Sequence, residues 1–394
     1  MLTPDGRLLF ATRSTRLFAY GALSVVLVFY LTSVGLSAAQ TGLLLTLTLL
    51  GDTAVSLWLT TRADRLGRRR MLLVGAALMA AAGVTFAWTR SFALLVVAGT
   101  IGVISPSGNE VGPFLSIEQA ALSEVVPDGK RTTAFAWYTL AGAFATALGS
   151  LGGGALSHTL RSYRVVVVLY AALGLLLALL FGRLSSRVEV SAPPPRAPFG
   201  ITRSRSVVLK LAGLFAVDAF AGGFVIQSFA AYWFFLRFGV DPATLGGIFF
   251  GANLLAGLSA LLASRLAARY GLVKTMVFTH LPSNLLLILV PLMPTLSLAV
   301  LVLLLRFSIS QMDVPTRQSY TMAVVRPEER AAAAGITGVA RTTGAAIAPV
   351  LAGWMYARPA LVNLPFFIAG ALKIVYDLLL YRGFVTQRPP EEAK

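Results

Sequence analysis

The sequence contains no cysteine, which excludes disulfides, thiolate metal sites and cysteine nucleophiles. Its two histidines, His158 and His280, cannot form a histidine metal site alone, and we expect neither a metal nor a cofactor. Charged residues make up only 12% of the 394 residues, about half the share found in soluble domains. Because 57% of the residues are hydrophobic, an ordinary soluble enzyme is excluded. The chain also lacks a phosphate-cradling loop and a nucleophile–base–metal set, which argues against direct use of ATP and against catalysis.

Long apolar runs fill most of the chain instead. A helix crosses the hydrocarbon core of a bilayer with about 20 apolar residues, and the runs are close to this length. They therefore predict a twelve-span membrane protein with short loops. The runs lie at about 15–34, 38–60, 70–88, 91–123, 131–156, 163–183, 207–235, 242–267, 273–292, 295–323, 330–356 and 360–381.

The net charge of +17 reflects an excess of Lys and Arg, which falls mainly in alternate loops. Basic residues gather on the cytoplasmic side of membrane proteins, so we expect both termini in the cytoplasm and no nucleic-acid partner. Arg far outnumbers Lys, and Ala, Leu and Gly are abundant, which favours a GC-rich bacterial genome and the bacterial cytoplasmic membrane. Among the basic residues of the loops, those expected on the side of the membrane opposite the cytoplasm are only Arg90, Arg161, Arg164, Arg237 and Arg358.

A proline-rich linker at 185–206 divides the chain into two predicted six-helix bundles, 1–184 and 207–394. The two halves repeat each other. The loop at 63–70 matches the loop at 267–274, and Glu118 corresponds to Arg317. Repeated six-helix halves are typical of secondary transporters whose substrate site lies near the middle of the membrane.

The loop from Asp64 through Arg65, Gly67 and Arg68 resembles the signature between helices 2 and 3 of the major facilitator superfamily, although the family's leading glycine falls at Thr60. The resemblance covers nearly the whole chain and implies an all-α integral membrane protein with twelve transmembrane helices in two pseudo-symmetric bundles. It also implies that this loop forms a cytoplasmic latch between the halves. The alternative is a loop that is simply basic because it faces the cytoplasm.

Small residues in spans 5 and 11 resemble the helix 5 signature of proton-coupled exporters, but span 5 lacks its proline. Small residues at such spacing let helices approach closely, so general packing is the alternative explanation. The residues in question are Gly149, Gly153, Gly154, Pro349 and Gly353.

Charged and polar residues inside the predicted spans are the candidate site. A charge within a bilayer costs about 2.5–3.5 kcal/mol on insertion scales, so such residues normally face a wet cavity or a partner. Pro106 and Pro113 should loosen span 4 around Glu110, whose freed carbonyls would line the cavity. The candidates for substrate or proton contact are Asn109, Glu110, Asp218, Arg306, Gln311, Asp313 and Arg341.

Several of these charges are expected to form pairs. Asp313 and Arg317 are four residues apart and predict an ion pair, as do Lys373 and Asp377. Glu118 and Arg317 are expected to form a cytoplasmic gate between the halves, with two separate local pairs as the alternative. For Glu110, the alternative to proton or substrate contact is a structural partnership with an arginine of helix 10 or a helix terminus.

The leading interpretation is a monomeric secondary transporter in the lipid bilayer that uses the proton gradient to export a small amphipathic compound. One alternative is a proton-coupled symporter that imports a nutrient or an organic anion, with Arg306, Arg317 and Arg341 as ligands. Another is a transporter-like receptor or lipid-handling protein without ion coupling.

Overall fold

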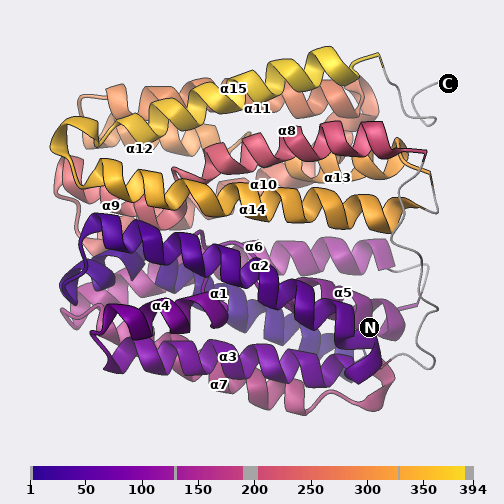
Figure 1. The fold of residues 1–394 in the computed structure, drawn as a ribbon, viewed down its shortest axis with the longest axis horizontal. Coiled ribbons are helices and arrows are strands. Elements are labelled where there is room, and N and C mark those ends of the chain that lie inside the picture. The colour runs from indigo at the N-terminus through magenta and orange to yellow at the C-terminus, as the bar shows by residue number, and fades with distance from the viewer. Residues whose placement is uncertain (1–2, 128–130, 190–202, 327–328, 387–394) are drawn as a thin grey trace. The chain divides into compact units, whose positions relative to one another are not determined.

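The computed structural model describes residues 3–127, 131–189, 203–326 and 329–386. Lys130, residues 387–394 and most of the predicted linker lie outside this part. Within it the chain is helical and contains no strand (Figure 1). The helices are α1 (Pro4–Ser33), α2 (Ala38–Leu66), α3 (Arg68–Trp88), α4 (Phe92–Ile101), α5 (Phe114–Val125), α6 (Arg131–Thr159), α7 (Arg164–Gly182), α8 (Arg205–Gly223), α9 (Gln227–Phe238), α10 (Pro242–Tyr270), α11 (Leu272–Leu289), α12 (Leu296–Phe307), α13 (Asp313–Ala323), α14 (Arg330–Tyr356) and α15 (Leu364–Phe384), with single 3-10 turns at η2 (Ser186–Val188), η3 (Val290–Leu292) and η5 (Pro359–Leu361).

The helices account for twelve spans. In the described part of the chain, nine segments are long and apolar enough to cross a membrane, with α8 and α9 counted as one. The shorter apolar helices α4 and α12 are each continued, after a break, by α5 and α13. The 27-residue helix α14 completes the set. The predicted all-α membrane fold is therefore confirmed.

Three spans are interrupted within the described residues, and the sequence explains the break between α4 and α5. The break between α4 and α5 contains Pro106 and Pro113, as predicted, and Gly108 and Gly112 adopt positive φ there. Pro315 lies in the first turn of α13, where proline is tolerated. Between α8 and α9 only Gly222 and Gly223 signal an interruption, and we did not predict one.

Contacts divide the chain into two units. The first comprises residues 1–196 and 226–253. Within it α1 packs against α6 and α7, α3 against α7, and α2 against α4. Helix α1 forms the centre of this unit, because nearly every residue from Leu17 to Leu31 is buried. Helix α9 also contacts α1 in this unit.

The second unit comprises residues 197–225 and 254–394. Here α8 packs against α14 and α15, and α11 packs against α15 and α13. The first and fifth spans of each sequence half are thus neighbours, as are the third and sixth. An apolar core cluster between α8, α11, α13 and α15 includes Leu211, Phe215, Met276, Tyr320 and Tyr376.

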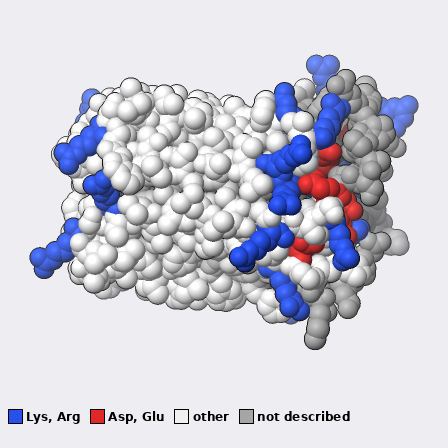
Figure 2. All heavy atoms as spheres, turned by 90° about the horizontal axis from the view of Figure 1, so that it is seen from below, with Lys and Arg blue, Asp and Glu red and all other residues white. Residues whose placement is uncertain are grey.

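The surface of the first unit is apolar where a bilayer would contact it. On α7, Leu175 and Leu179 are 58% and 68% exposed, whereas Tyr170 and Leu177 are buried. Figure 2 views the molecule from the side where α3 and α7 lie in Figure 1, and it shows a broad band without Lys, Arg, Asp or Glu between two charged edges. This distribution fits a multi-pass membrane protein.

Candidate functional site

The break between α4 and α5 places Glu110 outside regular helix. Four carbonyls that the break releases accept hydrogen bonds from protein groups. Val103 O accepts from Tyr170 at 2.6 Å, and Pro106 O accepts from Ser228 Oγ at 2.6 Å. Asn109 O accepts from Ser105 at 2.7 Å, and Val111 O from Tyr20 at 3.4 Å. Hydroxyl groups therefore satisfy these four carbonyls, one of them from within the break itself, and the expectation that they line a cavity stays a prediction.

Two arginines of α1 hold Glu110. Arg13 Nη1 lies 2.5 Å from Glu110 Oε1, and Arg16 Nη2 lies 3.1 Å from the same oxygen. The side chain of Glu110 is 19% exposed, whereas that of Arg16 is completely buried. The neighbouring Asn109 is exposed. The partners of Glu110 thus come from helix 1 and not from an arginine of helix 10.

Glu118 on α5 is the second acid bound to Arg16. The guanidinium of Arg16 donates to both carboxylate oxygens at 2.8 Å, which is a bidentate pair. Tyr138 and Thr12 donate to the same carboxylate at 2.5 and 2.7 Å. Four donated hydrogen bonds therefore satisfy a carboxylate whose exposed fraction is zero. Such satisfaction is what permits a charge to stay buried.

Asp218 on α8 is the centre of a corresponding cluster in the second unit. Its Oδ1 lies 2.5 Å from Lys373 Nζ, and its Oδ2 lies 3.1 Å from Arg317 Nη1. Arg317 also lies 3.0 Å from Asp313, so that predicted pair is confirmed. Arg317 and Glu118 each bind partners inside their own unit. The gate that we predicted between them stays a prediction.

Helices α11 and α15 add a buried histidine to this cluster. His280 Nδ1 lies 2.9 Å from Asp377 Oδ1, and Asn284 donates to Asp377 Oδ2 at 2.8 Å. The predicted pair between Lys373 and Asp377 is wrong, because Lys373 binds Asp218 and Asp377 binds His280. Both residues reach across to other helices although their spacing would allow them to meet.

Arg13, Arg16 and Arg317 are buried and paired with acids, whereas Arg306 and Arg341 are partly buried. Within the described residues neither has a carboxylate at ion-pair distance, and the Nε of each is buried without a hydrogen-bond partner. Both are in electrostatic range of Asp218 and Asp313. Gln311, in the break between α12 and α13, is partly buried. The second unit therefore contains positive charge that contacts within the described part of the chain do not neutralise.

The predicted latch loop forms a well-connected turn. Gly67 has a φ of 100°, a conformation that favours glycine, and the equivalent Gly271 has a φ of 87°. Arg68 Nε donates to Asp64 at 2.8 Å, and its Nη1 donates to Val188 O at 3.2 Å. Arg65 is exposed.

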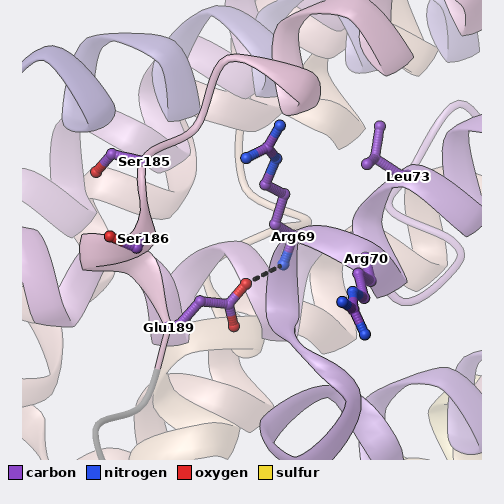
Figure 3. A pocket seen from close by; sticks show the side chains of 6 residues that line it. All are labelled: Arg69, Arg70, Leu73, Ser185, Ser186 and Glu189. Carbon is purple, nitrogen blue, oxygen red and sulfur yellow. Dashed lines mark hydrogen bonds between the residues drawn. The ribbon is translucent and has the colours of Figure 1, made fainter.

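A carboxylate from the end of span 6 caps helix α3 at this turn. Glu189 accepts from the backbone N–H of Arg68 at 2.7 Å. It also accepts from the backbone N–H of Arg69 at 3.1 Å (Figure 3). These donors have no partner within the helix, and an acid is favourable there. A cavity of about 380 Å³ lies beside the cap, lined by Arg69, Arg70, Leu73, Ser185, Ser186 and Glu189.

The small residues of span 5 serve close helix packing. Gly149 and Gly153 lie against the backbone of α1 at Phe18 and Ala22, and Gly154 lies against Gly246 of α10. Any larger side chain would overlap these neighbours. Pro349 lies within α14, and Gly353 is buried near the end of that helix. These contacts correspond to the general packing explanation and do not distinguish exporters from importers.

Sequence reasoning missed five charged or titratable members of the two clusters: Arg13, Arg16, His280, Lys373 and Asp377. We attributed both arginines of α1 to the cytoplasmic loop charge, and we assigned Lys373 to a local pair. A usable signal was present, because span 4 carries two acids and no base. Buried acids need partners, and Arg13 and Arg16 lie at the start of the first apolar run.

The twelve-span fold, the repeated halves and the buried charge clusters define a multi-pass membrane protein built like a secondary transporter. The model of the Major Facilitator Superfamily matches residues 9–311 and again 233–394. The chain therefore belongs to this superfamily.

Relatives and solved structures agree with this assignment. The chain is 30% identical over 417 residues to the uncharacterized membrane protein YJR124C of Saccharomyces cerevisiae, covering 95% of this chain and 93% of that protein. It resembles a bacterial homologue of the human lysosomal transporter Spinster, in an inward-facing and occupied conformation, with a TM-score of 0.77, 16% identity and 97% of each chain covered. It also resembles the nucleoside transporter NupG, with a TM-score of 0.77, 14% identity, and 97% and 99% of the two chains covered. At these identities the two structures show the fold alone.

Proposed function

We propose that the chain is a proton-coupled secondary active transporter that moves a small molecule by alternating access. One observation carries this proposal: Glu110, at the break in span 4, is a partly exposed carboxylate bound to two arginines of α1. Glu118, the other acid of this cluster, has no exposed surface. Water can thus deliver a proton to Glu110 but not directly to Glu118.

Protonation of Glu110 would affect the partners of the two arginines differently. Arg16 would keep its bidentate pair with Glu118. Arg13 would lose its carboxylate and retain the ring of Tyr138, which lies 4.5 Å from its guanidinium carbon. A buried cation without a partner is strongly unfavourable. Protonation therefore favours a rearrangement of α1 relative to the break, which is a means of shifting the equilibrium between conformations.

Two substrate classes remain candidates. Export of a small amphipathic compound is the first candidate; it rests on the sequence resemblance of span 5 to the exporter signature alone, because the contacts of its glycines are those of close helix packing. The second candidate is a small organic anion, which is favoured by the unneutralised Arg306 and Arg341. Guanidinium groups bind carboxylates well. The distribution of basic residues supports placing both termini in the cytoplasm, and the excess of Arg over Lys with abundant Ala, Leu and Gly is what favours a bacterial cytoplasmic membrane.

Proteoliposomes with a pH-sensitive dye inside test the coupling. A panel of amphipathic amines and short carboxylates is added with and without a pH gradient, and movement of protons and of compound is recorded. We expect Glu110→Gln to exchange a transported compound but to lose its gradient-driven accumulation. Asp241→Asn is the control, because Asp241 is an exposed N-terminal cap of α10 and asparagine caps equally well.

Three results would decide against the proposal. Full gradient-driven accumulation by Glu110→Gln would show that this carboxylate does not carry the proton. Compound flux that is unchanged when the gradient is collapsed would remove proton coupling. A panel member that binds without crossing would favour the receptor interpretation. In right-side-out vesicles, accumulation of the compound inside would indicate import, and its loss from the vesicles would indicate export.

A further inference from the structure

His280 lies between two carboxylates in the second unit. Its Nδ1 is 2.9 Å from Asp377 Oδ1, and its Nε2 is 3.8 Å from Asp218 Oδ1. The side chain of His280 is 5% exposed and that of Asp377 is 0% exposed. The three residues come from α11, α15 and α8, so the imidazole joins three spans.

Two groups face Nδ1 of the ring: Asp377 Oδ1 at 2.9 Å and the amide nitrogen of Asn284 at 3.2 Å. Asn284 also donates to the other oxygen of Asp377, at 2.8 Å. Because the charged carboxylate is the nearer group and accepts hydrogen bonds only, we infer that neutral His280 carries its proton on Nδ1. The lone pair of Nε2 then faces Asp218 Oδ1, another acceptor. The lone pair and the carboxylate oxygen repel each other. A second proton, on Nε2, would make their interaction attractive.

Asp218 Oδ1 is also the oxygen that Lys373 binds at 2.5 Å. A protonated His280 and the ammonium of Lys373 would compete for that oxygen, while Arg317 holds Oδ2. Proton uptake on α11 would therefore weaken the link between α15 and α8.

The charges at contact distance favour one added proton. Asp218, Asp313 and Asp377 supply three negative charges, and Arg317 and Lys373 supply two positive charges. Arg306 and Arg341 are in electrostatic range of Asp218 and Asp313 and oppose the added proton, but they lie beyond ion-pair distance and Coulomb energy falls with separation. The groups that surround His280 are Asp377, Lys373 and Tyr376 on α15, Asp218 on α8, Asp313 and Arg317 on α13, Arg306 on α12, Arg341 on α14 and Asn284 on its own helix.

We propose that His280, held between Asp377 and Asp218, is a second proton-binding site of this transporter. Its proton displaces Lys373 from Asp218 and so connects proton binding to the packing of α8, α11 and α15. The use of this site in coupling rests on the proposed function, but the presence of the site does not.

Because the chain has two histidines, a single substitution isolates the site. His158, whose side chain is 55% exposed, is replaced by Asn, and ¹⁵N-histidine then labels His280 alone in the full-length protein in lipid nanodiscs. NMR shifts of the two ring nitrogens follow the protonation state from about pH 5 to 8, the range in which histidine titrates. We expect the Nδ1–H form at high pH and the imidazolium at low pH.

Two variants separate a proton site from a merely structural histidine. Asp377→Asn removes the attraction for the imidazolium, so the midpoint should move toward acid. Lys373→Met removes the competing cation, and the midpoint should move the other way. Asp241→Asn, an exposed change in the other unit, should leave the curve as it is.

The titration curve of the His158→Asn protein is the first result that can overturn the proposal. An imidazole that stays neutral across the range, or that carries its proton on Nε2 at high pH, would contradict it, as would an Asp377→Asn curve identical to that of His158→Asn. If Glu110→Gln keeps full coupled transport while His280 titrates as expected, the role of Glu110 fails and this site stands.

Discussion

Arg16 and Glu118 form a bidentate ion pair in which both side chains are completely buried. The repeat places Arg317 where the first half has Glu118, and Asp218 where it has Arg16, about 200 residues later. Asp218 and Arg317 are again paired, at 3.1 Å. Each half thus ties its first span to the distal part of its fourth span, with the signs of the two charges exchanged.

Breaking the pair in the first unit should be costly. Arg16→Gln leaves the buried carboxylate of Glu118 without a cation, and we expect it to lower the free energy of unfolding by about 3–5 kcal/mol. Glu118→Gln leaves Arg16 with Glu110 as its remaining carboxylate, at 3.1 Å, so we expect a loss no larger than that of Arg16→Gln. The double variant should cost no more than the worse single one, because no unpaired charge remains. Thermal unfolding in detergent measures the three variants, with exposed Arg62→Gln as the control. Additive losses would mean that the two charges act independently.

Two adjacent glycines of α10 test the packing of α6. A Cβ at Gly246 would lie 2.8 Å from Ser150 O of α6, whereas a Cβ at Gly247 would meet nothing within 4 Å. We expect Gly246→Ala to lower the thermal midpoint. Gly247→Ala should leave it unchanged or raise it, because alanine favours a helix by about 1 kcal/mol. Equal effects of the two substitutions would contradict the close approach of α6 and α10.

The fold was predictable from the sequence because hydropathy and short loops determine it, and the break around Glu110 was predictable from Pro106 and Pro113. The partners of the buried charges were only partly predictable. Spacing on one helix correctly paired Asp313 with Arg317, but it wrongly paired Lys373 with Asp377. Contacts such as that of Arg16 with Glu118 join segments about 100 residues apart, and local periodicity carries no information about them.

The cap that Glu189 provides for α3 should protect the latch turn. Glu189→Ala leaves the N–H groups of Arg68 and Arg69 without their acceptor, and loss of an N-terminal cap typically costs about 1 kcal/mol. We expect faster amide hydrogen exchange at these two positions, with Glu189→Gln intermediate. Glu124→Gln is the control, because Glu124 contacts only the side chain of Arg68, at 3.5 Å. Unchanged amide hydrogen exchange in Glu189→Ala would show that Glu189 does not stabilise this turn.

The two arginines without carboxylates distinguish the candidate substrates. If an organic anion binds Arg306 and Arg341, short carboxylates should raise the thermal midpoint of the protein. Ligand at 100 times its Kd stabilises by about 2.7 kcal/mol. Arg306→Gln and Arg341→Gln should abolish this rise. Arg358→Gln should retain it, since Arg358 is exposed and stacks on Trp354 at 3.9 Å. A rise with amphipathic amines that survives both substitutions would favour the amphipathic substrate instead, because a cation gains nothing from two guanidinium groups.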